Sequence, residues 1–543
     1  MACSCVMATP QDYLNLMTAL RLMPSPALTL QLQKMLVAQP ELADTVASTP
    51  ANPNAVNEYH RHNTTMPQWP AHFLRPRSED ELVNMLEAKK NSATSFRAMA
   101  EGFGFANAAW TKDCLVQCFQ MNDLLDLEAD TFHEEKEQEL ADDLVRVESG
   151  ITFGKLNDAL AQIGKTVCQQ PGYRDLTVVG CASAGGHGSG LGLYGIAGWI
   201  EAVELVTFDA QKNVRVMRIE RTDGLTDPAK YKKKHPEAKY VLRQDDALFH
   251  AARCGQGHLG IISAVTLRTR PRFFLKEDRF ISTWNEALPQ INQLLVHPAV
   301  HGIHVWINPY VSTGKTSPTV LITKLTKATQ QPWPWGVRGP GILFGGRQII
   351  TDFIGYQAAT DPKGVAAKLD FALDACRSTN VLMPSTQALD FGPPNDLAVN
   401  AASVGFDASR ADEVLKALIT QFDSWRQTNN WVTSPIGMRW VKASEDCLSP
   451  QYQRDTIMLE VPILKGTPNA AETLDKYTNY MMDTFDGRPH WGQQNPMTRA
   501  QFERNYAAGL PAFLAAFREL NPLESFDGPL TAQLGLRELS QMS

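Results

Sequence analysis

The chain has 543 residues, with 51 Lys and Arg against 58 Asp and Glu, and a formal net charge of −7 at pH 7. That balance supplies no cationic field that would attract nucleic acid or an anionic membrane surface. Hydrophobic residues make up 43% and charged residues 20% of the chain. These shares are those of ordinary globular proteins and exclude extensive disorder, while the length predicts at least two domains or one large two-part fold.

The N-terminal part predicts a helical extension and polar linker over residues 1–60, broken at Pro24, Pro26 and Pro40. The first twenty residues hold no Lys or Arg, and no stretch of the chain approaches the ~20 apolar residues of a membrane span. The nine cysteines are an odd, scattered set that cannot all pair within one chain. We therefore expect reduced thiols and a cytoplasmic protein.

From Trp69 onward, short apolar and β-branched runs alternate with helical patterns, which favours an α/β or α+β architecture. The predicted strands cover residues 95–99, 144–147, 202–208, 214–219 and 261–267, and a helix is predicted at 153–163. Between residues 273 and 487, antiparallel-style strands are expected at 302–307 and 456–463, and helices at 364–377 and 409–429. Residues 331–346 are rich in Trp, Pro and Gly and predict an ordered excursion or lid, and residues 500–520 predict one helix.

Two glycine-rich segments dominate the motif content. The first covers residues 96–105 (FRAMAEGFGF) and the second residues 172–190 (GYRDLTVVGCASAGGHGSG). Turns poor in side chains let backbone N–H groups face a pyrophosphate closely. A Rossmann fingerprint would need a third glycine at Asn107, so that interpretation fails for the first segment. Taken singly, either segment could equally be a set of tight turns.

Together, in this order and at this separation, the two segments resemble the flavin domain of the vanillyl-alcohol oxidase / p-cresol methylhydroxylase superfamily. The similarity runs from about Trp69 to Arg270, through Pro76, residues 147–160 and residues 257–267, and resumes near the C-terminus. The C-terminal half is most similar to the sugar-alcohol and aldonolactone oxidase branch. The matching stretches there are residues 438–439, 448–450, 454–456 and 488–492.

The resemblance implies an α+β fold with a PCMH-type FAD-binding domain at 61–275, an antiparallel-sheet substrate (cap) domain at 276–487, and a segment 488–543 that returns to the FAD domain. It implies an FAD-dependent oxidoreductase that oxidises an alcohol or similar C–H donor by hydride transfer to flavin N5. Electrons would pass to O2 or another acceptor. Three segments are assigned to the cofactor, with the residues Arg97, Ala98, Met99, Ala100, Glu101, Gly102, Phe103, Gly104, Thr177, Val178, Gly180, Ala182, Gly185, His187, Gly188, Ser189, Gly190, Gly260, Ile261 and Ile262.

Three positions depart from the family pattern. Many relatives attach FAD through a histidine in the first glycine loop, where this chain has Phe103 or, with a shifted match, Phe105. We therefore predict non-covalent FAD. Polyol and lactone oxidases carry a glutamate two positions before the family's arginine, here Gly437, and a lysine after His-Trp-Gly, here Gln493. The loss of two charged contacts weakens the case for a sugar or lactone substrate.

Four residues are candidates for the chemistry. Arg439 is placed by the resemblance and would stabilise charge on substrate or flavin. Glu460 stands alone among apolar neighbours in a strand and could act as base, although strand alternation could equally point it to solvent. His490 is either a base or a packed part of its turn, and Gln493 can hydrogen-bond a substrate oxygen without serving as a base. His187 is expected to order the phosphate loop.

Competing interpretations stay open at this point. A helical alignment of His297, His301 and His304 is interrupted by Pro298 and Gly302, so no metal site is predicted. The first rival function is an oxidase of the same fold acting on a bulky, less polar natural-product or sterol-like substrate. The second is a redox-inactive flavin-binding or interaction protein that kept the fold. No membrane or nucleic-acid partner is expected.

Overall fold

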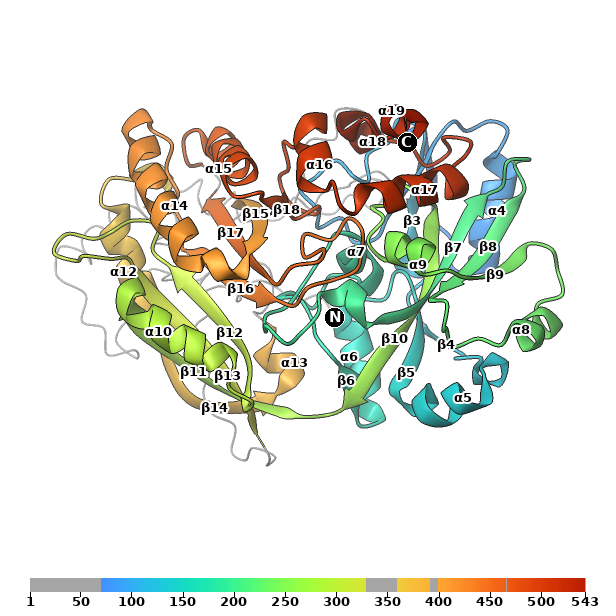
Figure 1. Ribbon diagram of the computed structural model, residues 1–543, viewed down its shortest axis with the longest axis horizontal. Coiled ribbons are helices and arrows are strands. Elements are labelled where there is room, and N and C mark those ends of the chain that lie inside the picture. Colours follow the sequence, from blue (N-terminus) through green and yellow to red (C-terminus); the bar gives the residue numbers. More distant parts are fainter. Residues whose placement is uncertain (1–69, 329–358, 391–398, 465, 543) are drawn as a thin grey trace, which may run out of the picture. The chain divides into compact units, whose positions relative to one another are not determined.

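The computed structural model describes residues 70–328, 359–390, 399–464 and 466–542 (Figure 1). The predicted helical extension at 1–60 and the predicted excursion at 331–346 lie outside the described residues. Within the described ranges, no helix is long and apolar enough to cross a membrane.

The first half of the described chain forms a small parallel sheet and a larger mixed one. The small sheet has the order β1-β3-β2, with all three strands parallel. The mixed sheet has the order β4-β5-β10-β7-β8-β9, and β6 pairs with β10. The strand bounds are β1 His72–Leu74, β2 Phe96–Met99, β3 Cys114–Gln117, β4 Leu124–Leu125, β5 Leu144–Glu148, β6 Lys165–Val167, β7 Ile200–Phe208, β8 Val214–Glu220, β9 Tyr240–Gln244 and β10 Ile261–Pro271.

Helices cover these sheets, and local sequence explains where they begin. Ser78 caps the first of them by accepting a hydrogen bond from Glu81 N (3.2 Å), and three acidic residues in its first turn favour the helix dipole. Leu82 and Leu86 on its inner face are fully buried. The helices of this part are α4 Glu79–Lys89, α5 Glu134–Leu140, α6 Phe153–Gln162, α7 Val178–Ser183, α8 Pro228–Lys234 and α9 Asp246–Arg253.

The C-terminal helices share a hydrophobic core with the first half. Phe513 and Phe517 are fully buried in the same cluster as Val147 and Phe249. The single helix predicted at 500–520 is wrong, because the segment forms two helices. Gly509 lies between them against the carbonyl of Cys447, where a side chain would clash. The helices are α16 Arg499–Asn505, α17 Leu510–Leu520, α18 Pro529–Leu534 and α19 Leu536–Met542.

The other part of the described chain builds an antiparallel sheet, as the α+β prediction requires. Its order is β14-β11-β13-β12-β16-β17-β15-β18. The last strand, at Arg488–Pro489, therefore still belongs to this sheet. The bounds are β11 Phe274–Thr283, β12 Val300–Ile307, β13 Thr319–Ala328, β14 Ser378–Pro384, β15 Val399–Asp407, β16 Ile436–Val441, β17 Thr456–Leu464 and β18 Arg488–Pro489.

Helices cover one face of this sheet, and the candidate site described below lies on the other face. Val305, Met438 and Leu459 are buried in one cluster with residues of the covering helices. Because side chains alternate along a strand, their sequence neighbours point to the opposite face. The helices of this part are α10 Trp284–Leu295, α12 Val365–Ala375, α13 Ser385–Ala388, α14 Ala411–Trp425 and α15 Ala470–Thr484.

Candidate active site

The face of the antiparallel sheet opposite the cluster of Val305, which we call the open face, carries two rows of side chains across three neighbouring strands. Trp306, Gly437 and Glu460 stand directly opposite one another on β12, β16 and β17. The next row holds His304, Arg439 and Met458 in the same register. Directly opposed residues have Cβ atoms within about 5.5 Å, so this register alone brings Arg439 and Glu460 together diagonally.

Three predicted residues meet in one polar cluster on this face. Arg439 Nη2 lies 3.2 Å from Glu460 Oε2, and Gln493 Nε2 donates to Glu460 Oε1 at 2.8 Å. The side chains of Arg439 and Glu460 are 13% and 15% exposed, so alternation does not point Glu460 into bulk solvent. Gln493 Oε1 is buried and has no hydrogen-bond partner among the described residues. The cluster therefore holds one buried acceptor without a hydrogen-bond partner among the described residues.

The turn that carries Gln493 is held by backbone contacts on three sides. His490 N donates to Ser403 O at 2.8 Å, and Gln493 N donates to His490 O at 3.1 Å. Trp491, 1% exposed, donates from its indole to Leu448 O at 2.7 Å. Phe105 N donates to Gly492 O at 2.8 Å. The end of the first glycine segment thus lies against the turn that carries Gln493, although the two are far apart in sequence.

Two histidines beside the cluster take opposite tautomers. His187 Nδ1 lies 2.9 Å from Gly188 O, and a carbonyl only accepts, so Nδ1 carries the proton and Nε2 is left as an acceptor. His490 Nδ1 accepts from Gly492 N at 3.0 Å, so its proton sits on Nε2. Burial, then Arg439, lower the pKa of His187 well below its usual value and that of His490 to about 4. Both rings are neutral near pH 7, and in this tautomer His490 offers an N–H donor at Nε2.

The second glycine segment is wedged between neighbouring parts of the chain. Gly190 N donates to Trp440 O at 2.7 Å, and this glycine adopts φ +154°, with His301 O 2.7 Å from where a Cβ would be. Gly185 adopts φ +73° against the ring of Pro450. A side chain at Gly188 would overlap Gln169. These glycines are needed for the chain's own close packing, which brings His187 and Ser189 to the open face of the sheet.

The remaining residues assigned to the second and third cofactor segments make structural contacts within the chain. Thr177 caps α7 by accepting from Gly180 N at 3.2 Å. Val178 and Ala182 are buried in the core. Gly260 adopts φ +150° against the backbone of β7. The strand β10 begins directly after it, and its first residues pair with β7, with Ile261 opposite Val206 and Ile262 opposite Leu205.

Arg97 supports the first glycine loop from below. It is 1% exposed, and its guanidinium donates to the carbonyls of Ala108, Gln256, Gly257 and Phe526. All five N–H donors of the group are used in these contacts. Burial lowers its pKa to about 10. Arg97 therefore joins three loops around β2, and a direct contact with a cofactor would require it to give up one of these bonds.

The first glycine loop itself follows β2, which already contains Ala98 and Met99. The half-buried residues after the strand are Ala100, Glu101, Gly102, Phe103 and Gly104. Gly102 adopts φ +71°. Gly104 has ordinary space around a Cβ, the nearest atom being Gly492 O at 3.7 Å. A side-chain-poor loop beside the buried, unpaired Gln493 acceptor fits a flat cofactor with polar edges such as a flavin.

Two aromatic residues of the site escaped the sequence interpretation. Trp306, 6% exposed, packs in a small cluster that Tyr173 joins. A Cβ on Gly437 would lie 2.9 Å from Trp306 Cζ3, so the indole occupies the space beside the missing family glutamate. Burial and Glu460 raise the pKa of Tyr173 well above its usual value. The sequence offered one signal for Tyr173, which lies within the second glycine segment. It offered no such signal for Trp306.

Two of the three histidines considered as metal ligands lie on a strand, as the sequence predicts for residues 302–307. His301 and His304 lie on β12, three residues apart, and a helical alignment does not arise. In the part of the chain that the structure describes, no group of three His, Cys, Asp or Glu side chains could hold a metal ion.

Comparisons with known proteins identify the domains of the chain. Residues 70–212 match the model of an FAD binding domain, and residues 265–533 match D-arabinono-1,4-lactone oxidase. The L-gulono-1,4-lactone dehydrogenase of Mycobacterium tuberculosis is 22% identical, over 80% of this chain and 90% of its own. The L-gulonolactone oxidase of Mus musculus is 23% identical, over 81% and 89%. Cholesterol oxidase from Brevibacterium sterolicum has a similar fold, with a TM-score of 0.66 and 13% identity, over 86% and 94%.

The chain is thus an FAD-dependent oxidoreductase that acts on CH–OH donors and has a small-molecule substrate and an electron acceptor. It belongs to the vanillyl-alcohol oxidase / p-cresol methylhydroxylase superfamily of FAD-linked oxidases, on the side of the sugar-alcohol and aldonolactone oxidases.

Proposed function

We propose that this enzyme oxidises a neutral alcohol at the open face of the antiparallel sheet, with Arg439, Glu460 and Gln493 as its polar contacts. The observation that carries the proposal is the position of Glu460, which bridges the other two at 3.2 and 2.8 Å. Each oxygen of Glu460 has one such contact, and a carboxylate offers about four acceptor sites. Glu460 keeps capacity for a substrate hydroxyl.

The roles follow from these groups. Bound FAD supplies the hydride acceptor at N5. Glu460 accepts the proton that leaves the substrate hydroxyl, and Arg439 stabilises the negative charge that develops on that oxygen. Gln493 Oε1 accepts a hydrogen bond from a second donor of the ligand. His187 Nε2 and His490 Nε2–H offer an acceptor and a donor from neutral rings whose centroids lie 5.9 Å apart.

The substrate class follows from what the site holds in place of the family's charged groups. Relatives of the branch act on sugar lactones by their names. Here Trp306 fills the space beside Gly437, Gln493 is uncharged, and Arg439 is paired with Glu460. A neutral ligand fits such a site better than an anion, since an anion would meet Glu460 without a free cation. Trp306 and Tyr173 support the second candidate, a bulkier and less polar alcohol.

Other parts of the proposal concern cofactor attachment, domains and location. Phe103 and Phe105 supply no nucleophile in the first loop, which supports non-covalent FAD. The proposed domains are the FAD-binding domain at 61–275, the substrate domain at 276–487 and the C-terminal segment at 488–543. The first two residues of that segment, 488–489, pair in the antiparallel sheet. The seven cysteines in the described ranges are free thiols, which supports a cytoplasmic location. Acid precipitation tests the attachment: yellow colour released into the supernatant is expected, and colour retained in the pellet would contradict it.

The test of the main proposal is anaerobic stopped-flow reduction of the bound flavin by a panel of neutral sugars, lactones and less polar alcohols. Glu460→Gln keeps the hydrogen-bond geometry and removes the base, so we expect reduction at least ~100-fold slower with an unchanged resting flavin spectrum. The matched control is Glu472→Gln, an exposed glutamate on α15 paired with Lys476. Equal rates in Glu460→Gln and the parent would exclude Glu460 as base. Failure of every donor would favour the redox-inactive alternative.

A further inference from the structure

A cavity of about 260 Å³ lies outside the polar cluster just described. Its walls are the segment from Gly190 to Leu193, the end of α10, the start of β12, Arg270 at the end of β10 and Lys327 on β13. The lining includes two basic side chains and two imidazoles, and none of the lining residues is acidic. In a chain of net charge −7, this is a local concentration of positive charge.

The cationic wall is built into the fold. The Arg270 guanidinium lies 4.5 Å from the centroid of the Phe273 ring, and it donates from Nη2 to Cys168 O. The other partner of Phe273 is His301, at a ring-centroid distance of 5.2 Å. This stack of three side chains fixes Arg270 beside the cavity without a carboxylate partner among the described residues.

Two buried polar atoms of this wall lack hydrogen-bond partners among the described residues. His301 is 5% exposed, and its Nε2 makes no hydrogen bond to any described residue. The same holds for Nε of Arg270. Burial, then Arg270 and Lys327, lower the pKa of His301 to about 3, so its ring is neutral near pH 7 and can supply one N–H donor. Buried polar groups are paired in most native structures, so these two point to a ligand.

We propose that this cavity binds a small amphiphilic anion, a carboxylate or phosphate group on a short apolar body. Arg270, Lys327 and the neutral His301 would hold the anionic group through charge-assisted and N–H hydrogen bonds. Lys327 Nζ now contacts only the carbonyl of Pro298, at 3.3 Å, among the hydrogen bonds recorded for it. Leu191, Leu193 and Leu295 in the lining would contact the apolar body.

The cavity shares a wall with the second glycine segment. Ser189 donates from Oγ to Ile303 O, and Gly302 packs closely against the backbone of Ser189. Gly190, which lines the cavity, also pairs with Val441 at the end of the strand that carries Arg439. An anion in the cavity would therefore touch the segment that continues from His187, and the flavin spectrum should report its binding.

The experiment is calorimetric titration of the full-length holoprotein at low ionic strength, with inorganic phosphate and hexanoate as separate probes. Saturable binding of hexanoate that is tighter than that of phosphate is expected for an amphiphilic carboxylate site, and the reverse order identifies a phosphate site. Lys327→Met and His301→Phe should each weaken binding about tenfold. Phe keeps the ring contact with Phe273, and Lys327 is exposed, so both variants test binding without emptying the core.

The matched control is Lys233→Met, an exposed lysine on α8 that does not line the cavity, and its affinity should equal that of the parent. A flavin difference spectrum that saturates with the same dissociation constant would link the cavity to the loop at His187. If neither phosphate nor hexanoate binds, the proposal is overturned. So would equal affinities in the parent, Lys327→Met and His301→Phe when thermal unfolding shows all three to be folded.

Discussion

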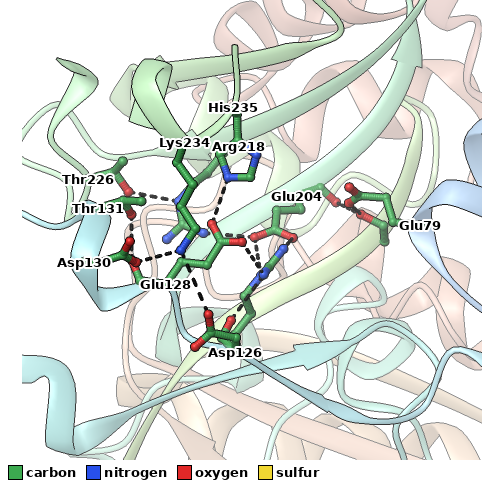
Figure 2. Close-up of polar contacts among 12 residues, drawn as sticks. Glu79, Asp126, Glu128, Asp130, Thr131, Glu204, Arg218, Thr226, Lys234 and His235 are labelled. Atoms are coloured by element: carbon green, nitrogen blue, oxygen red, sulfur yellow. Dashed lines mark hydrogen bonds and ion pairs between the residues drawn. The ribbon is translucent and has the colours of Figure 1, made fainter. Parts of the chain in front are cut away.

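Two of the clusters that join arginines to carboxylates at low exposure differ in how many of their carboxylate acceptor sites are occupied by the protein itself. Around β5, β7 and β8, Glu204 accepts from both Arg146 and Arg218, and Glu220 accepts from Arg218 and Thr226. Figure 2 shows Arg218 and Glu204 of this cluster together with Thr226 and Glu79. These carboxylates are 5% and 0% exposed. At the open sheet face, Glu460 accepts one bond on each oxygen, and Gln493 beside it has an unpaired acceptor.

The difference separates a structural cluster from the cluster that we propose to be reactive. A carboxylate whose lone pairs are all engaged by its own chain has little left for a ligand, and its removal is felt as lost stability. A carboxylate with spare acceptor capacity beside an unpaired acceptor can bind and deprotonate a substrate. Stability should therefore respond to the first cluster and turnover to the second.

The largest expected effect is a loss of stability when the first cluster, around Glu204 and Glu220, loses its shared arginine. Arg218→Met removes the cation between Glu204 and Glu220 and leaves two buried carboxylates short of a partner, which should cost about 3–5 kcal/mol of unfolding free energy. Urea denaturation of the holoprotein measures it. Arg221→Met, at an arginine 40% exposed and paired with Glu201, is the control and should cost under about 1 kcal/mol. Equal losses of unfolding free energy in Arg218→Met and Arg221→Met would show that the first cluster has no special structural role.

A second effect comes from Glu79, which joins the first cluster from α4. It faces Glu204 on β7, Arg146 on β5, Asp80 and the Ser263 hydroxyl, and burial followed by Glu204 raises its pKa to about 7. Its folded pKa exceeds the usual 4.5, so the unfolded chain loses this proton first and stability falls as pH rises from about 4.5 to 7. Glu79→Gln should remove that slope and stabilise the protein above pH 7 by at most about 3 kcal/mol.

Urea midpoints at pH 5, 6, 7 and 8 check this prediction. The difference between Glu79→Gln and the parent should be small at pH 5 and grow toward pH 8. Glu87→Gln, on the same helix and paired with Lys90, gives the control, since the pKa of Glu87 is lowered and its removal should not stabilise the protein at any of these values. A difference that stays constant with pH would show that Glu79 ionises normally in the folded state.

Sequence reasoning reached the fold class and the residues of the reactive cluster, but not its connections. The resemblance placed Arg439 and Gln493 one at a time, and period-two alternation left Glu460 on either face, because alternation does not say which face the helices cover. The pairing of Gly437 with Glu460 depends on the register of β16 against β17, which no local pattern encodes. The helix break before α17 depends on the Cys447 carbonyl, a contact distant in sequence.

The smallest expected effect is a change in KM when Gln493 of the second cluster is replaced. Gln493→Met has similar volume but removes the unpaired Oε1 acceptor and the donor to Glu460. Loss of one ligand hydrogen bond of about 1 kcal/mol should raise KM about fivefold for a hydroxylated substrate, with a smaller change in the rate of flavin reduction. Gln494→Met, whose side chain contacts Ala471 O and Asp475 instead, is the adjacent control. Since a structural role would lower the urea midpoint and leave KM unchanged, measuring both quantities decides whether the spare acceptor serves the substrate or the fold.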